Sequence, residues 1–174
     1  LIFPAYYGNQ NVNVYYKLDK SLPATLPSSI ANSELKEKFN IVSPEIVLID
    51  KNISGNELSE LTNKLKEVKG VDLVLASNSI TEFGIPTSML PDELVEIFEN
   101  DKYQLIILNS TYEVASDELS TQIDEVNKIV KSYDKRAITA GEGPLTKDLT
   151  TIADHDFKMV NYTSIIIIFV IMLI

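Results

Sequence analysis

The sequence predicts an α+β protein in which two strand-helix-strand units build one sheet and the chain then continues into a membrane helix. Three observations support this prediction. Two short apolar runs of the strand type each precede an amphipathic helix and a further strand. Both helices carry an apolar stripe on one side only, as expected for helices that cover one face of a sheet. The C-terminal residues, in contrast, are apolar on every side.

The first unit begins with Ile46–Ile49, an apolar run of the strand type. Ser54 and Glu57 have the spacing of a capping box, in which each residue satisfies a free backbone N–H of the other at a helix start. Gly70 ends the predicted helix, and Val71–Leu75 forms the next strand. The stripe of the helix is Leu58, Leu61, Leu65 and Val68.

The second unit repeats this order. Tyr103–Leu108 is a predicted strand, Ser116 caps a helix, and Ala137–Ala140 is a weaker strand. The apolar side of this helix is Leu119, Ile123, Val126, Val130 and Tyr133. Between the units we expect a loop over Ser77–Leu90 and a short helix over Pro91–Asn100. A ferredoxin-like βαβ-βαβ arrangement with one-sided helices is the simplest closure of two such units.

The segment before the first unit is expected to be mostly irregular. Asn9–Tyr16 alternates loosely and favours an extended conformation, while Leu22-Pro23 and Leu26-Pro27 disfavour regular structure. Ser28 or Ser29 is the predicted cap of a helix ending near Phe39, with its charged residues in water.

The C-terminal segment sets the class of the protein. Pro144 fits the first turn of a helix, and Glu142 lies near the positive end of the helix dipole. Ser164–Ile174 is apolar on all sides, but it would span only about 16 Å of a hydrocarbon layer about 30 Å thick. One alternative is a buried C-terminal helix, yet a chain of 174 residues has a modest core in which to cover it. Before Thr163 in the sequence, the predicted helix carries an apolar stripe on one side only, formed by Leu145, Leu149, Ile152 and Met159.

These observations predict four segments. Residues 1–8, where tyrosines follow an apolar run, are expected to end one transmembrane helix. Residues 9–43 form the lead-in and short helix, and residues 44–141 form the βαβ-βαβ domain. Residues 142–174 form a connecting helix that runs into a truncated transmembrane helix. We therefore expect a loop domain held between two membrane helices, as a piece of a longer protein.

Composition excludes several partners. The chain has 15 Lys and Arg against 25 Asp and Glu, a formal net charge of −10, which repels the phosphates of nucleic acid. It has no cysteine, so a disulfide framework, a thiolate metal site and a thiol nucleophile are excluded. No basic cluster flanks either apolar end, which favours the outer side of the membrane. The N-terminal residues lack the basic region of a cleavable signal peptide.

Few residues are candidates for chemistry. The only histidine lies between two carboxylates in Asp154-His155-Asp156, but adjacent helix residues point about 100° apart and cannot converge on a metal. Asp154 and Lys158 have the i,i+4 spacing of a surface ion pair. Gly141–Lys147 lacks the spacing of a phosphate-binding loop, and the single arginine, Arg136, has no glycine-rich cradle beside it. We predict no enzyme, catalytic residue, metal site or cofactor.

Three triplets match the pattern for N-glycosylation, a pattern that arises often by chance. They are Asn52-Ile-Ser54, Asn109-Ser-Thr111 and Asn161-Tyr-Thr163.

Several of these motifs, taken in order, resemble one family of membrane proteins. They are Tyr16-x-Leu18, Leu22-Pro23, Leu26-Pro27-Ser28, Leu35-Lys-Glu-Lys-Phe39, the turn Val68-Lys-Gly-Val71, and Gly141-Glu-Gly-Pro-Leu-Thr-Lys-Asp-Leu149 before an apolar helix. Together they resemble the first extracytoplasmic loop of MMPL-type transporters, which belong to the RND (resistance-nodulation-division) superfamily. The resemblance covers essentially the whole chain.

The resemblance implies a porter domain of a multi-pass exporter in the cell membrane, driven by the proton gradient and moving lipids, drugs or other hydrophobic compounds. Its implied partners are the lipid bilayer, a lipid-like substrate, further transmembrane helices and a second porter domain. The proton-carrying carboxylates of such transporters lie in later membrane helices, so none is assigned to this chain. The alternative is a membrane-anchored extracytoplasmic sensory or interaction module without transport activity, because a fold does not fix a function.

Overall fold

A computed structural model describes residues 22–82 and 97–174 and confirms the α+β class. Its centre is a four-stranded sheet in the order β2-β3-β1-β4, and every neighbouring pair is antiparallel. In each strand-helix-strand unit, a strand of the other unit lies between the two strands. The assignment to the ferredoxin-like fold stays a prediction. The strands are β1 (Ser43–Asp50), β2 (Val71–Leu75), β3 (Tyr103–Ser110) and β4 (Ile138–Gly141).

The register decides which side chains of β1 reach the core. Ser43 of β1 pairs with Ser110 of β3, and Glu45 pairs with Gly141 of β4. Side chains alternate between the two faces, so this register sends Val47 and Ile49 to the same face as Glu45. Both apolar residues have no exposed surface. The inward face of β1 therefore contains one carboxyl group among apolar side chains.

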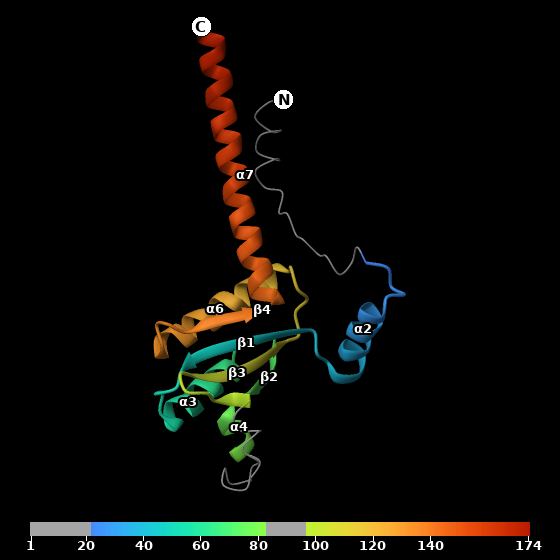
Figure 1. The fold of residues 1–174 in the computed structure, drawn as a ribbon, viewed down its shortest axis with the longest axis vertical. Coiled ribbons are helices and arrows are strands. Elements are labelled where there is room, and N and C mark those ends of the chain that lie inside the picture. Colours follow the sequence, from blue (N-terminus) through green and yellow to red (C-terminus); the bar gives the residue numbers. More distant parts are fainter. Residues whose placement is uncertain (1–21, 83–96) are drawn as a thin grey trace.

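Both long helices of the sheet domain cover the same face, as predicted. They are α3 (Gly55–Lys66) and α6 (Asp117–Tyr133), which pack against each other behind the sheet (Figure 1). Ser54 forms the predicted capping box with Glu57, and the Ser116 hydroxyl accepts from the N–H of Leu119. The core between helices and sheet includes Val47, Ile49, Leu58, Leu61, Leu65, Ile106, Leu108, Val126 and Val130.

The opposite face of the sheet is apolar and only partly shielded. Ile46 of β1 and Leu73 of β2 are each 39 % exposed, and Ile138 of β4 is 54 % exposed. Tyr103 of β3 adds a half-exposed ring. Several exposed apolar side chains therefore share one face of the sheet. A grouping of this kind is typical of an interaction surface, whereas single exposed apolar residues are common on any protein.

The helix α2 (Pro27–Phe39) corrects two predictions. Leu26-Pro27 does not interrupt regular structure: Leu26 is the N-cap and Pro27 is the first helical residue, where its missing N–H costs no hydrogen bond. The predicted caps, Ser28 and Ser29, therefore lie inside the helix. No residue of α2 is buried.

Further boundaries differ from the predictions. The helix α3 ends at Lys66 and not at Gly70, so Val68 of the predicted stripe lies beyond the helix, although it is buried. Ser77–Glu82 was expected to be loop but forms a short helix, α4, in which the Ser79 hydroxyl accepts from the N–H of Ala76. The last strand begins at Ile138, one residue later than predicted. The expected end of a membrane helix at 1–8, the extended segment at Asn9–Tyr16 and most of the loop and helix between 83 and 96 lie outside the described residues.

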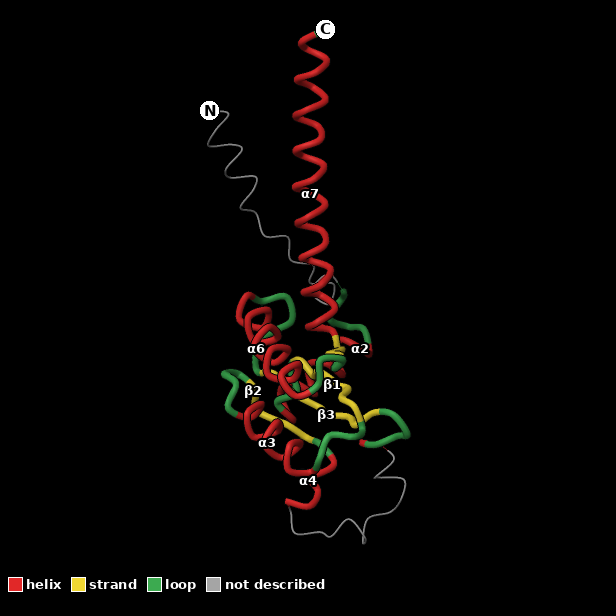
Figure 2. The backbone as a smooth tube through the Cα atoms, turned by 90° about the vertical axis from the view of Figure 1, so that its left-hand side faces the viewer, coloured by secondary structure: helices red, strands yellow, loops and turns green. Residues whose placement is uncertain are grey.

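The helix α7 (Glu142–Leu173) follows β4 directly and is the longest element described. In both views it leaves the sheet domain and extends away from it as a rod (Figures 1 and 2). Glu142 and Pro144 lie in its first turn, as predicted.

Candidate functional site

The helix α7 is long and apolar enough to cross a membrane. Its 32 residues correspond to about 48 Å of helix, more than the hydrocarbon layer of about 30 Å. None of its most apolar stretch is buried, and every residue from Ile165 to Ile174 is exposed. An apolar surface of this size is not covered by the sheet domain, which excludes the buried-helix alternative for the structure described.

Gly141 forms the link between the last strand and α7. Its φ of 141° lies in a region that residues with a side chain rarely adopt. A Cβ atom at this position would also lie 2.9 Å from the carbonyl oxygen of Pro44 and 3.2 Å from the Cα of Glu45. Both are backbone atoms of β1, which cannot move aside as a flexible side chain could. Glycine at position 141 therefore allows the close approach between β1 and the start of α7.

Gly143 brings the first turn of α7 against the inward end of β1. A Cβ atom at Gly143 would lie 2.9 Å from Cδ2 of Leu119 on α6, 3.2 Å from Oε1 of Glu45 and 3.3 Å from Oγ of Ser43. We call this meeting of β1, α6 and α7 the junction. Gly143 and Pro144 are the only buried residues of α7, all of which the structure describes.

A lysine fastens α7 to α6 on the outer side of the junction. Lys147 Nζ donates to the carbonyl oxygen of Ser120, at 2.8 Å, and forms an ion pair with Asp124. The lysine side chain is largely covered, whereas that of Asp124 is exposed. Because Lys147 lies one turn beyond Gly143, the two contacts fix both the position and the direction of the helix base.

Glu45 is the unusual residue of the junction. It is 2 % exposed, and neither its Oε1 nor the Oγ of Ser43 has a hydrogen-bond partner in the protein. Burial raises the pKa of Glu45 from 4.5 to about 7, and the charge of Lys147 offsets part of this rise. Desolvation has this direction because it disfavours the ionised carboxylate. Glu45 is therefore a carboxyl group that changes charge near neutral pH.

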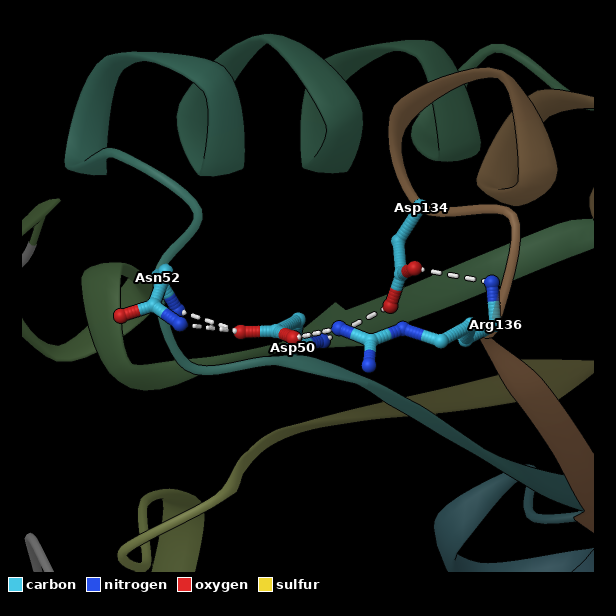
Figure 3. A network of polar contacts seen from close by, with 4 residues as sticks. All are labelled: Asp50, Asn52, Asp134 and Arg136. Carbon is cyan, nitrogen blue, oxygen red and sulfur yellow. Dashed lines mark hydrogen bonds and ion pairs between the residues drawn. The ribbon is translucent and has the colours of Figure 1, made fainter.

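A polar network closes the opposite end of β1 (Figure 3). Asp50 accepts from the backbone N–H of Asn52 at 2.9 Å and from the Arg136 guanidinium. Asp134 accepts from the N–H groups of Asp50 and Arg136. The Asn52 backbone N–H is the main cause that holds the pKa of Asp50 below its usual value. The network ties the turn before β4 to the end of β1, and its arginine is paired with a carboxylate.

A groove separates α2 from the sheet domain. Its volume is about 660 Å³, within the range of small-molecule sites. Its lining is mixed, with Leu35, Val42 and Pro44 among the apolar residues and Ser28, Ser29, Asn32, Ser33, Lys36, Glu113 and Glu142 as the polar and charged ones. Across it, Lys36 of α2 forms an exposed ion pair with Glu113, at 2.9 Å.

The predicted candidates for chemistry remain apart from these features. Asp154, His155 and Asp156 are exposed on α7, and Asp154 pairs with Lys158 at 2.6 Å, as their spacing predicted. Among residues 22–82 and 97–174, no three histidine and acidic side chains are placed to hold a metal ion. The prediction of no catalytic or metal residue itself stays a prediction.

The other weak motifs also have structural roles. Gly141–Lys147 forms the end of β4 and the first turns of α7, and so contains no loop that could surround a phosphate. Asn109, in one glycosylation triplet, is buried and donates to the carbonyl oxygen of Asn40 and to Asp72. Asn52 is exposed, and Asn161 is half-buried on α7.

Sequence reasoning missed Glu45. Alternation in β1 was the available signal, because Glu45, Val47 and Ile49 are spaced by two and share a face. The predicted strand began at Ile46, one residue too late to include the carboxyl group. The close approach that requires glycine at positions 141 and 143 depends on strand pairing, so no local pattern of residues indicated it.

Together these features define a class of protein: an α+β domain that continues directly into a helix suited to a membrane. Residues 94–174, which include β3, α6, β4 and α7, match the model of the MMPL family. Over residues 94–174 this match confirms the predicted resemblance to MMPL-type transporters of the RND superfamily, whereas for residues 1–93 the resemblance stays a prediction. Proteins of this family are membrane transporters and not enzymes. No curated protein matches the chain.

Proposed function

We propose that this chain forms an extracytoplasmic porter domain of a multi-pass RND/MMPL-type transporter in the cell membrane. The transporter exports lipids, drugs or other hydrophobic compounds and uses the proton gradient. The observation that carries this proposal is the direct continuation of β4 into α7, an apolar helix that no part of the described domain covers. The family match over the same elements supports it. The four-segment division of the chain belongs to the same proposal.

In this role, α7 transmits movement between the sheet and the bilayer. An uninterrupted helix is stiff, so a tilt imposed in the membrane reaches its base. The base is held by the close contact of Gly143 and by the bonds of Lys147 to α6. Movement of α7 therefore acts directly on β1 and α6.

Two surfaces suit the partners that we propose. The groove beside α2 has the size for part of a lipid-like substrate, and its mixed apolar and polar lining suits an amphipathic one. The half-exposed apolar face of the sheet, with Ile46, Leu73 and Ile138, suits contact with a second porter domain. Apart from Glu142 at the start of α7, which lines the groove, both surfaces belong to the domain and leave α7 to face lipid and the remaining membrane helices.

The side of the membrane is tested by chemical labelling, since the chain has no cysteine of its own. Asn56, exposed at the start of α3, is replaced by cysteine in a full-length protein whose cysteines outside this chain have been changed to serine, and intact cells are treated with a membrane-impermeant maleimide. We expect Asn56→Cys to be labelled before lysis. A matched variant, Ile168→Cys in α7, should stay unlabelled because it faces lipid. Labelling of Asn56→Cys only after lysis would contradict an extracytoplasmic domain.

Transport is tested by two independent results. The full-length gene is expected to encode several further membrane spans and a second domain of this kind, and cells that lack it should accumulate more of a hydrophobic fluorescent dye. Unchanged accumulation of a panel of dyes and labelled lipids would count against export. A kinase, cyclase or nucleotide-binding domain after the membrane helix would support the sensory module instead.

A further inference from the structure

Glu45 occupies a place where a charge affects two elements at once. Its carboxyl group faces the first turn of α7 from β1, and α6 closes the third side through Leu119. It is 2 % exposed, and its Oε1 has no hydrogen-bond partner. A neutral carboxylic acid is tolerated in such a site, whereas an ionised carboxylate without hydrogen bonds is not.

The surroundings offer Glu45 one partial counter-charge. Lys147 attracts the ionised form, but its own bonds go to Asp124 and to the carbonyl oxygen of Ser120. The neighbours of Glu45 across the sheet, Leu108 and Gly141, carry no charge. The charged residues near the starts of α6 and α7 are Asp117, Glu118, Asp124, Glu142, Lys147 and Asp148, and of these the charge of Lys147 acts on the pKa of Glu45.

We propose that Glu45 is a proton-operated latch for α7. Neutral Glu45 allows the first turn of α7 to pack against β1 and α6, and loss of its proton drives the helix base away from them. The opening gives the carboxylate access to water and to the free N–H groups of the first turn of α7. The latch is a property of the domain and does not depend on which compound, if any, is transported.

The size of the effect follows from the change of environment. Burial raises the pKa of Glu45 to about 7 in the docked state, and exposure returns it toward 4.5. Linkage between proton binding and docking then predicts that the docking equilibrium constant falls about 30-fold between pH 5.5 and pH 8.5. Within this interval the docking equilibrium constant should change mainly between pH 5.5 and pH 7, because Glu45 is then protonated in the docked state and ionised in the undocked state.

The test measures the position of α7 directly. Thr121 of α6 and Thr151 of α7 are exposed, and each hydroxyl bonds only to a backbone carbonyl of its own helix. Both are replaced by cysteine in the full chain, spin labels are attached in lipid nanodiscs, and the distance distribution is recorded from pH 5.5 to pH 8.5. We expect one narrow distribution in acid and a broader or longer population that grows as the pH rises.

Two variants decide the cause. Glu45→Gln cannot ionise, so its distribution should stay narrow at every pH, whereas Glu142→Gln, in the first turn of the same helix but exposed, should follow the unmodified chain. A pH response that persists in Glu45→Gln overturns the latch. Should Glu45→Gln fail to fold, Glu45→Met is a neutral substitute of similar length. The spin-labelled parent chain is also a test by itself: an unchanged distance distribution across this pH range refutes the latch. That result would not affect the proposed transport function, which the dye and lipid assays test separately.

Discussion

The burial of Glu45 predicts an unusual dependence of stability on pH. The folded chain keeps a proton on Glu45 up to about pH 7, whereas the unfolded chain releases it near pH 4.5. Between these values the folded state binds more protons, so the free energy of unfolding falls as the pH rises. The stabilising contribution is complete below pH 4.5 and is lost as the pH passes through 7.

The magnitude follows from the difference between the two pKa values. Each unit of pKa difference corresponds to about 1.4 kcal/mol, which gives a loss of up to about 3 kcal/mol between pH 4.5 and pH 8.5, reached in full when α7 stays docked. This is a large share of the 5 to 15 kcal/mol that is typical for a whole domain. Asp50 and Glu57 act in the opposite sense, because hydrogen bonds hold their pKa values below the usual range, and their contribution is lost only as the pH falls into the acid region.

The assay compares unfolding of the parent chain and Glu45→Gln by urea in detergent micelles, followed by circular dichroism at several pH values. Every other titrating group is common to both proteins, so the difference between their unfolding free energies isolates Glu45. The buried amide that the variant carries at this position adds an offset that does not vary with pH. We expect the difference to change by up to about 3 kcal/mol across the range, with Glu142→Gln parallel to the parent chain. Parallel curves for the parent chain and Glu45→Gln would refute the reasoning.

Three further changes test other parts of the structure. Gly141→Ala should lower the unfolding free energy by about 1 to 3 kcal/mol through backbone strain and contact with β1, whereas Gly55→Ala, with open space around it, should be nearly neutral in the same urea titration. Ser54→Ala removes the capping box of α3 and should cost about 1 kcal/mol; equal stability of this variant and the parent chain would contradict the role of the cap. Ile152→Pro should cost about 3 kcal/mol locally and abolish export in whole cells, because it breaks α7 between the junction and the membrane. Ile152→Ala is its control, and normal export by Ile152→Pro would argue against transmission of movement through the helix.

The elements that the sequence predicted well are those with local signals. The capping box of Ser54 and Glu57, the cap at Ser116 and the stripes of α3 and α6 depend on spacing within one helix, and all are confirmed. The predicted helix start at Ser28 or Ser29 was wrong because two signals conflict there. Pro27 both disfavours helix in the residue before it and fits the first helical position, and the second effect determines the start.

The junction could not be predicted in the same way, because its contacts join residues far apart in sequence. Glu45 approaches Gly143 only after β4 pairs with β1 in the observed register. A shift of one residue would turn Glu45 to the opposite face, where a carboxyl group is solvated and titrates normally. The raised pKa therefore depends on strand pairing, and no local pattern of residues contains that information.

The distribution of burial along α7 explains why the junction has such influence. Of its 32 residues, all described, only Gly143 and Pro144 are buried. A helix packed along its whole length would need many contacts to break before it could move, whereas this helix is held within its first two turns. Substitutions between Thr150 and Thr163 should therefore act through the continuity of the helix alone, while those at Gly143, Lys147 and Glu45 should change its docking. A small change at the base, such as one proton, is then sufficient to redirect the far end of a rod about 48 Å long.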